Sequence, residues 1–458
     1  MLIFMSLLDA CSTRDVVFVE SREGDASAFL DGGTPTWNVP DAAVDAAGDA
    51  TVRPSNDGGN ATDGRCSVDG SVPVLNLGDG GCVGDLAARA FRYALCVCED
   101  AVFNAGLASA VSGTVGTDAG ASASVGINGN LVTASRSTIH GSLWTRSGIS
   151  SASDLAVDGE LHCASNLSGA GSASVRSDAW IGGNIDLGTF SVSGTLTQPA
   201  SANNRASIRA GARVFGAVAA VAPCDCDPAQ RLPITALIQG LAAANDNAAA
   251  QFSSQAFASV LSGQTLELPC GKLYATALHS AAPLTLRVSA QTVLAVTGDL
   301  DLGGDFTIEM TTPSASLDLL VGGTIRSNSR VRLGSAARPS ALRIYVAGDT
   351  NLDTSALWEL HGNLYAPTAI VNTSGGALFD GSLFVRSINA SAPVVFGYDK
   401  GILSISDGCG PPTGCTDCRD CRGQACTLGR CASCTDSSEC CAPLVCVNGS
   451  CVPEAPLR

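Results

Sequence analysis

The chain has 458 residues, a formal net charge of −16 at pH 7 and only 5% aromatic residues. This acidic balance excludes nucleic acid as a partner, because such binding requires clustered Lys and Arg side chains, and it also disfavours adhesion to anionic lipid. Hydrophobic residues still make up 45% of the chain, so a large aliphatic core can be buried.

The first eleven residues form a short apolar run that ends at Ala10-Cys11. This run resembles a bacterial lipoprotein signal, in which the cysteine is lipidated, although Asp9 and the lack of basic residues depart from that pattern. An ordinary secretory signal peptide is the alternative. Residues 1–11 therefore predict export, as an outer-membrane or cell-surface lipoprotein with Cys11 as the candidate lipidation site, or as a secreted protein. No apolar run of transmembrane length occurs elsewhere, so only a lipid anchor would reach the membrane.

Residues 12–65 are rich in Asp, Ala, Gly, Thr and Pro and lack periodicity, which predicts a disordered acidic linker. Residues 66–106 change character and predict a cysteine-containing helical cap. Within it, apolar residues at helical spacing favour a helix over Asp85–Phe103.

Two cysteines of this cap, Cys96 and Cys98, would point to different sides of a helix and so bond to different partners. The nearest candidates in the sequence are Cys66 and Cys82. Four cysteines allow three pairings, and the sequence does not choose between them.

Residues 107–406 are dominated by short, Gly-punctuated apolar segments without βαβ spacing. A five-residue motif of the form apolar–x–Gly–x–apolar recurs, as in Ile127–Leu131, Val157–Leu161 and Val321–Ile325. Its glycines are unevenly spaced, and we interpret them as stacked corners of an irregular parallel β-solenoid. The alternative is a large β-sandwich, whose strands also alternate apolar and polar residues.

We expect a helical insert to interrupt this domain at about 233–262. The segment from Pro233 to Asn245 has proline in its first turn and an apolar face, which predicts a helix. Cys224, Cys226 and Cys270 flank the insert, and a disulfide from Cys270 to one of the other two would close its ends.

Residues 409–458 are so rich in cysteine that they predict a disulfide-stapled minidomain. Zinc is the alternative for the CxxC pairs, although the segment contains no histidine. Six of its cysteines resemble a cystine-knot pattern: Cys426, Cys434, Cys440, Cys441, Cys446 and Cys451. The remaining cysteines leave the connectivity open: Cys409, Cys415, Cys418, Cys421 and Cys431. If Cys11 is lipidated, an odd number remains, and the isolated Cys163 is the expected buried free thiol.

Several longer segments carry a family resemblance, among them "YALCVCE", "PCDCDP", "NDNAA", "LPCGKLY", "LDLLVGGTI", "LRIYVAG", "GNLYAPTA", and "GSLFVRS" followed by "YDKGIL". Over residues 66–405 the chain resembles an uncharacterised family of exported bacterial β-solenoid proteins, of the domain-of-unknown-function 7305 type. The block at 340–403 is similar to a domain of bacterial surface and pilus-associated proteins. The resemblance implies a fold and a location, and no reaction, ligand or catalytic residue.

The sequence contains few candidate catalytic or metal-binding residues. Four aspartates near strand ends could serve a carbohydrate-active β-helix enzyme, but their glycine-rich surroundings are typical of solvated turns: Asp299, Asp301, Asp305 and Asp318. None of the four histidines has a partner at metal-ligand spacing, and no phosphate loop follows the Gly-Gly pairs. We therefore expect no catalytic residue, metal or cofactor.

These observations predict a non-enzymatic structural or adhesive protein of the cell surface, with a rigid β-solenoid on a flexible linker. Its expected partner is an envelope polysaccharide or a surface protein, with no nucleic acid involved, and its oligomeric state is open. The alternatives are a carbohydrate-active β-helix enzyme, which clustered carboxylates would favour, and a component of envelope or pilus assembly, which an exposed strand edge would favour.

Overall fold

The computed structural model describes residues 90–109, 123–348 and 351–404, with short pieces between residues 425 and 453. The predicted signal and acidic linker lie outside these residues. So do the following candidate cysteines: Cys11, Cys66, Cys82, Cys409, Cys415, Cys418, Cys421 and Cys441. Within the described residues, no helix is both long and apolar enough to cross a membrane.

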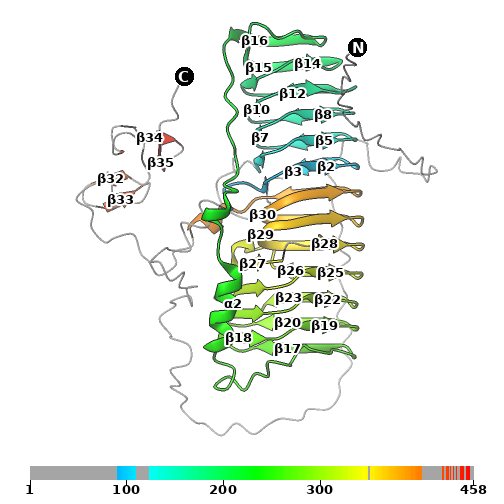
Figure 1. Cartoon of the computed structure of the whole chain (residues 1–458), viewed down its shortest axis with the longest axis vertical. Coiled ribbons are helices and arrows are strands. Elements are labelled where there is room, and N and C mark those ends of the chain that lie inside the picture. Colours follow the sequence, from blue (N-terminus) through cyan, green and yellow to red (C-terminus); the bar gives the residue numbers. More distant parts are fainter. Residues whose placement is uncertain are drawn as a thin grey trace, which may run out of the picture. The chain divides into compact units, whose positions relative to one another are not determined.

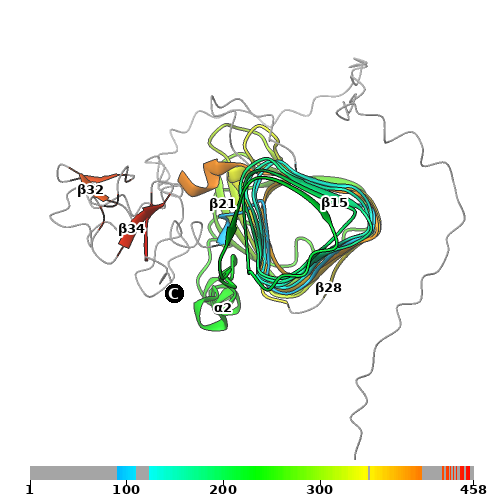
Figure 2. The same ribbon diagram turned by 90° about the horizontal axis from the view of Figure 1, so that it is seen from above.

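The strands from β1 to β31, between residues 95 and 397, form a parallel β-solenoid, which confirms the predicted fold class (Figure 1). Each strand pairs in parallel with the equivalent strand of the next rung, as β1 (Leu95–Val97) does with β4 (Val125–Ile127). Seen from above, the strands superpose along three sides, which we call faces A, B and C (Figure 2).

Each short strand lies on a single face, A, B or C. Face A contains β1, β4, β7 (Leu143–Thr145), β10 (Leu161–Cys163), β13 (Ala179–Ile181), β18 (Gly271–Ala275), β21 (Gln291–Val296), β24 (Ser316–Val321) and β27 (Leu342–Val346). Face B contains β2 (Ala101–Phe103), β5 (Leu131–Thr133), β8 (Ile149–Ser151), β11 (Leu167–Ser168), β14 (Ile185–Asp186), β19 (Leu278–Ser280), β22 (Leu300–Leu302), β25 (Ile325–Ser327) and β28 (Asn351–Thr354). Face C contains β3 (Leu107–Ser109), β6 (Ser137–Ile139), β9 (Leu155–Val157), β12 (Ser172–Val175), β17 (Gln264–Leu268), β20 (Leu284–Val288), β23 (Phe306–Met310), β26 (Val331–Gly334) and β31 (Val394–Gly397). Longer strands bend around corners: β15 (Thr189–Gln198), β16 (Ser207–Phe215), β29 (Trp358–Thr373) and β30 (Ala377–Ala390).

Strand alternation places aliphatic side chains inside the solenoid. In β20, Leu284, Leu286 and Val288 are buried, whereas Thr285 and Arg287 point outward. One apolar core made of such inward residues continues through the whole solenoid. Each rung thus supplies the wall that its neighbour lacks.

The rungs do not follow chain order along the solenoid. The first strands, β1 to β3, lie in the middle of the solenoid, from where the chain winds to the β16 end and returns outside the strands (Figure 1). It then winds from β17 back to the middle, where β30 pairs with β1 and β2, and β31 pairs with β3. Leu95 lies in register with Leu383. Residues almost 290 positions apart in the chain therefore contact each other in neighbouring rungs.

The returning segment carries the predicted helix as α2 (Ile234–Ala243), whose buried side chains are Ile234, Ile238 and Leu241. Short 3₁₀ helices flank the same side of the molecule: η2 (Pro228–Gln230), η3 (Pro339–Ala341) and η4 (Lys400–Ser404). With the returning segment, they cover a second apolar cluster on the outer side of face A that includes Tyr345, Tyr365 and Phe384.

The helical cap predicted at 66–106 is wrong for its described part, because β1 and β2 occupy Leu95–Val97 and Ala101–Phe103. The solenoid therefore begins before residue 107. All three residues of β1 are buried, since one side faces the main core and the other lies under the returning segment. A strand buried on both sides loses its alternation, and its apolar run mimics a helix.

The apolar–x–Gly–x–apolar motif lies at corners of the solenoid, as predicted. It usually connects two strands and does not lie within one strand. It serves two different corners: Gly129, Gly183, Gly298 and Gly323 turn from face A to face B, whereas Gly141, Gly159, Gly362 and Gly381 turn from face C to face A. This double use causes the uneven spacing, because equivalent positions in the first half are 18 residues apart.

Replacing Gly381 by alanine is expected to destabilise the protein by roughly 2 kcal/mol or more. Gly381 has a φ of 144°, and an added Cβ would lie 2.1 Å from the carbonyl oxygen of Gly362 in the next rung. The control is Gly240→Ala in α2, where an added Cβ meets nothing within 4 Å. That change should stabilise the helix by up to about 1 kcal/mol. Urea unfolding of both variants measures the difference, and equal effects would contradict this account of the corner.

The described pieces of the cysteine-rich tail form two antiparallel hairpins, β32 (Ala425–Thr427) with β33 (Arg430–Ala432) and β34 (Leu444–Val447) with β35 (Ser450–Pro453). Cys434 and Cys440 are disulfide-bonded, which excludes the zinc alternative for these two cysteines. Cys426 lies opposite Cys431, and Cys446 opposite Cys451, across the hairpins.

Candidate functional site

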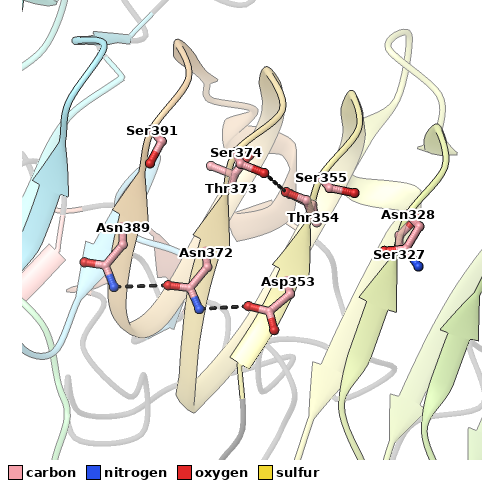
Figure 3. A pocket seen from close by; sticks show the side chains of 10 residues that line it. All are labelled: Ser327, Asn328, Asp353, Thr354, Ser355, Asn372, Thr373, Ser374, Asn389 and Ser391. Carbon is pink, nitrogen blue, oxygen red and sulfur yellow. Dashed lines mark hydrogen bonds between the residues drawn. The ribbon is translucent and has the colours of Figure 1, made fainter. Parts of the chain in front are cut away.

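An open polar groove of about 330 Å³ crosses face B where β25, β28, β29 and β30 lie side by side (Figure 3). Its centre is a row of three outward side chains in register, Asp353, Asn372 and Asn389. The neighbouring residue Thr373 points inward, and its hydroxyl donates to the carbonyl oxygen of Gly375 at the corner, at 2.6 Å. The strand pleat therefore leaves the amides to face solvent.

The three central side chains form a directed hydrogen-bond ladder. Asn389 Nδ2 donates to Asn372 Oδ1 at 3.1 Å, and Asn372 Nδ2 donates to Asp353 Oδ1 at 2.8 Å. Each amide can make further hydrogen bonds beyond those of the ladder. The ladder thus presents oriented donors and acceptors about 4.8 Å apart, the spacing of neighbouring strands.

A second row of small polar side chains lines the corner beside the ladder. It consists of Asn328, Ser355, Ser374 and Ser391, all of them exposed. Of the ten residues that line the groove, Asp353 is the single carboxylate. Glycoside hydrolysis by the usual mechanism uses a pair of carboxyl groups, whereas a single carboxylate lines this groove.

The four aspartates considered for catalysis have structural partners. Asp299 Oδ1 accepts the backbone N–H of Thr324 at 2.8 Å, and Asp305 Oδ1 accepts that of Arg330 at 3.2 Å. Both carboxylates therefore cap a corner of the next rung. Asp301 lies 3.5 Å from His279, and Asp318 is buried against Arg343.

The histidines also pair with carboxylates, mostly across rungs. His140 Nδ1 lies 2.7 Å from Asp158, His361 Nδ1 lies 3.3 Å from Asp380, and His162 Nε2 lies 3.2 Å from Glu160. Sequence reasoning missed these pairs, because the partners of His140 and His361 come close only when successive rungs stack. Among the described residues, no group of three or more His, Cys, Asp or Glu side chains could hold a metal ion.

A stack of aromatic rings stands on the outer side of face A. Trp144 and His162 have ring centroids 3.4 Å apart, and His162 and Trp180 have centroids 4.1 Å apart, with nearly parallel planes. Burial between the indole rings lowers the pKa of His162, although its hydrogen bond to Glu160 opposes that shift. His162 is thus covered by an indole on each face, and each tryptophan has one face covered by His162.

The flanking cysteines hold the returning segment to the solenoid. Cys96 is bonded to Cys224 and Cys98 to Cys226. The predicted pairing of Cys270 with Cys224 or Cys226 is therefore wrong, although Cys270 is itself disulfide-bonded. Cys96 and Cys98 do take different partners, but Cys66 and Cys82 are not those partners.

Cys163 is a buried free thiol, as its isolation in the sequence predicted. Burial raises its pKa, so the thiolate is disfavoured. It is an inert member of the core.

No curated protein matches the chain. Among solved structures, the chain is similar to an ice-binding protein from an Antarctic bacterium of the Flavobacteriaceae, with 12% identity over 67% of this chain and 96% of that one. The TM-score is 0.18, so this likeness carries no argument about function.

Residues 227–405 match a family model described as "Domain of unknown function (DUF7305)". The match begins in the returning segment and includes α2 and every rung from β17 to β31. The resemblance inferred from the sequence is thereby confirmed for this part of the chain. Residues 227–405, the half of the solenoid that carries the polar groove, are thus similar to the DUF7305 family.

Proposed function

We propose that the protein is a non-enzymatic cell-surface protein whose solenoid binds an extended envelope polysaccharide along the amide ladder. The carrying observation is the ladder itself, in which Asp353, Asn372 and Asn389 present oriented polar atoms at the strand spacing in an open groove. A polysaccharide carries hydroxyl groups at regular intervals, and such groups both donate and accept hydrogen bonds. The groove contains no second carboxylate, which favours binding over cleavage.

Replacing both Asn372 and Asn389 by alanine is expected to weaken polysaccharide binding at least tenfold, because it removes the oriented amides and leaves the fold intact. The probe is polysaccharide purified from the envelope of the source bacterium, and sedimentation with the full chain measures binding. The matched control is Ser150→Ala, which removes an exposed polar group on β8 of the same face outside the groove. Unchanged binding of the double variant would refute the site, and release of new reducing ends would support the enzyme alternative instead.

We also propose that the protein is exported and anchored through a lipid on Cys11. The disulfides between β1 and the returning segment support export, because such bonds persist in oxidising compartments. Cys11→Ser is expected to move the protein from the detergent-extracted membrane fraction to the soluble fraction. Mass spectrometry of the mature N-terminus decides the point, and an unmodified terminus would leave a freely secreted protein.

A further inference from the structure

The two ends of the solenoid differ in their capping. At the β17 end, residues 246–260 lie against faces A and B: Asp246 N donates to the carbonyl oxygen of Lys272, and Val260 N donates to that of His279. Phe257 closes the core there and is fully buried. At the other end β16 is the last strand, and β15 is the only strand that pairs with it among the described residues. Within the part of the chain that the structure describes, this second end is an open strand edge.

The backbone of β16 can accept another strand. Ser207 N donates to the carbonyl oxygen of Gly188, on the β15 side. Because the side to which backbone groups point alternates along a strand, Ile208 and Ala210 direct their N–H and C=O groups away from β15. Arg213 Nη2 donates to the carbonyl oxygen of Ile208 at 3.2 Å, so a side chain of β16 itself occupies an acceptor that an added strand would use.

Apolar side chains are exposed beside this edge. Phe215 is 69% exposed and Val214 50%, and Val221 in the returning segment is 53% exposed. Proteins usually protect strand edges with charges, prolines or covering segments. Exposed aromatic and aliphatic side chains beside unpaired backbone are instead typical of a docking surface.

The positive charge at the β16 end indicates which kind of partner could bind there. Arg205, Arg209 and Arg213 gather on the last rung, although the whole chain has a net charge of −16. Arg205 lies 3.9 Å from Asp186, and this contact is largely exposed on the arginine side. A second copy docked tip to tip would bring the same arginines together, which like-charge repulsion disfavours. An acidic strand would complement them.

We propose that the β16 edge binds an extended acidic peptide strand of another protein, which adds to the solenoid as its next rung. Backbone hydrogen bonds to Ala210, and to Ile208 once Arg213 releases its carbonyl oxygen, would supply affinity, as in other cases of strand addition. Apolar side chains of the partner would cover Phe215, and its carboxylates would face Arg209 and Arg213. The surface is independent of the polar groove on face B.

The test uses the full chain and two nine-residue peptides, one alternating valine and glutamate and the other alternating valine and lysine. We expect the glutamate peptide to bind and to slow amide hydrogen exchange at Ile208 and Ala210. Ala210→Pro removes one open N–H without removing a donor to β15, and it should weaken this binding at least tenfold. Arg209→Glu with Arg213→Glu should reverse the preference toward the lysine peptide.

Val132→Glu is the matched control, because Val132 is an exposed valine, 38% accessible, on β5 of face B. It should leave peptide binding unchanged. Failure of the glutamate peptide to bind, or equal binding of the two peptides by the unaltered chain, would overturn the proposal. So would a dimer in sedimentation that Ala210→Pro dissociates, because the occupant would then be a second copy. If Ala210→Pro does not fold, the charge-reversed variant decides alone.

Discussion

Replacing Arg343 by leucine is expected to destabilise the protein by about 3–5 kcal/mol, because it leaves the carboxylate of Asp318 buried without a countercharge. The two side chains are 5% and 6% exposed, and Arg343 binds Asp318 through two parallel hydrogen bonds of 2.5 and 2.7 Å. Burial disfavours the charge of Arg343, but the adjacent Asp318 more than offsets this effect and raises its pKa. The guanidinium therefore stays charged, and only its pairing makes the buried site tolerable.

The matched variant replaces both partners, Asp318→Leu with Arg343→Met. It should recover most of the lost stability, because a buried ion pair and an apolar pair of similar volume differ little in net free energy. Some loss is expected to persist, since Arg343 Nη1 also donates to the carbonyl oxygen of Ser340 in η3. Urea unfolding in oxidising buffer measures all three proteins. If the double variant were as unstable as the single one, burial of an unpaired charge would not be the cause.

Removing both disulfides of the returning segment, by Cys224→Ser with Cys226→Ser, is expected to lower the free energy of unfolding by about 5 kcal/mol. Each bridge joins residues 128 positions apart, so the first to form removes much of the entropy of the unfolded chain. The second closes only a small ring beside the first. Removing Cys98–Cys226 alone, with serine at both positions, should therefore cost far less.

Limited proteolysis distinguishes this account from general destabilisation. Without either bridge, cleavage should begin in residues 216–233, which β1 would no longer hold, while the rungs persist. Cys163→Ala is the control, because Cys163 is a free thiol in the core and pins no segment. Equal loss of stability from removing one bridge and from removing both would contradict the entropic explanation.

Local patterns in the sequence predicted much of the fold. Alternation in Leu284–Val288 revealed a strand with one buried side, and the helical face after Pro233 revealed α2. Both are properties of a few consecutive residues, set by the strand period of two and the helix period of 3.6. The isolated position of Cys163 similarly indicated its free thiol.

The polar groove was not predicted. Asp353, Asn372 and Asn389 stand 19 and 17 residues apart, and each alone is an ordinary outward residue of a strand. Only stacking of three rungs turns them into a ladder. A search for polar residues that recur at the rung length could have found them. The rung length varies in the second half of the solenoid, however, because contacts between neighbouring rungs span 17 to 27 residues.

The sequence by itself determined the β-strands, their aliphatic interior side and the helix on the outside, because all of these follow from short-range periodicity, and its recurring glycines favoured a parallel β-solenoid over a β-sandwich. The tertiary structure decided the order of the rungs, since the first strand, β1, lies in the middle of the solenoid and Leu95 meets Leu383. The same reversal brings Cys224 to Cys96 and buries β1 on both sides, which is why neither the disulfide pairing nor that strand could be derived locally. Contacts between residues far apart in the chain depend on the path of the whole backbone, and local residue patterns do not encode that path.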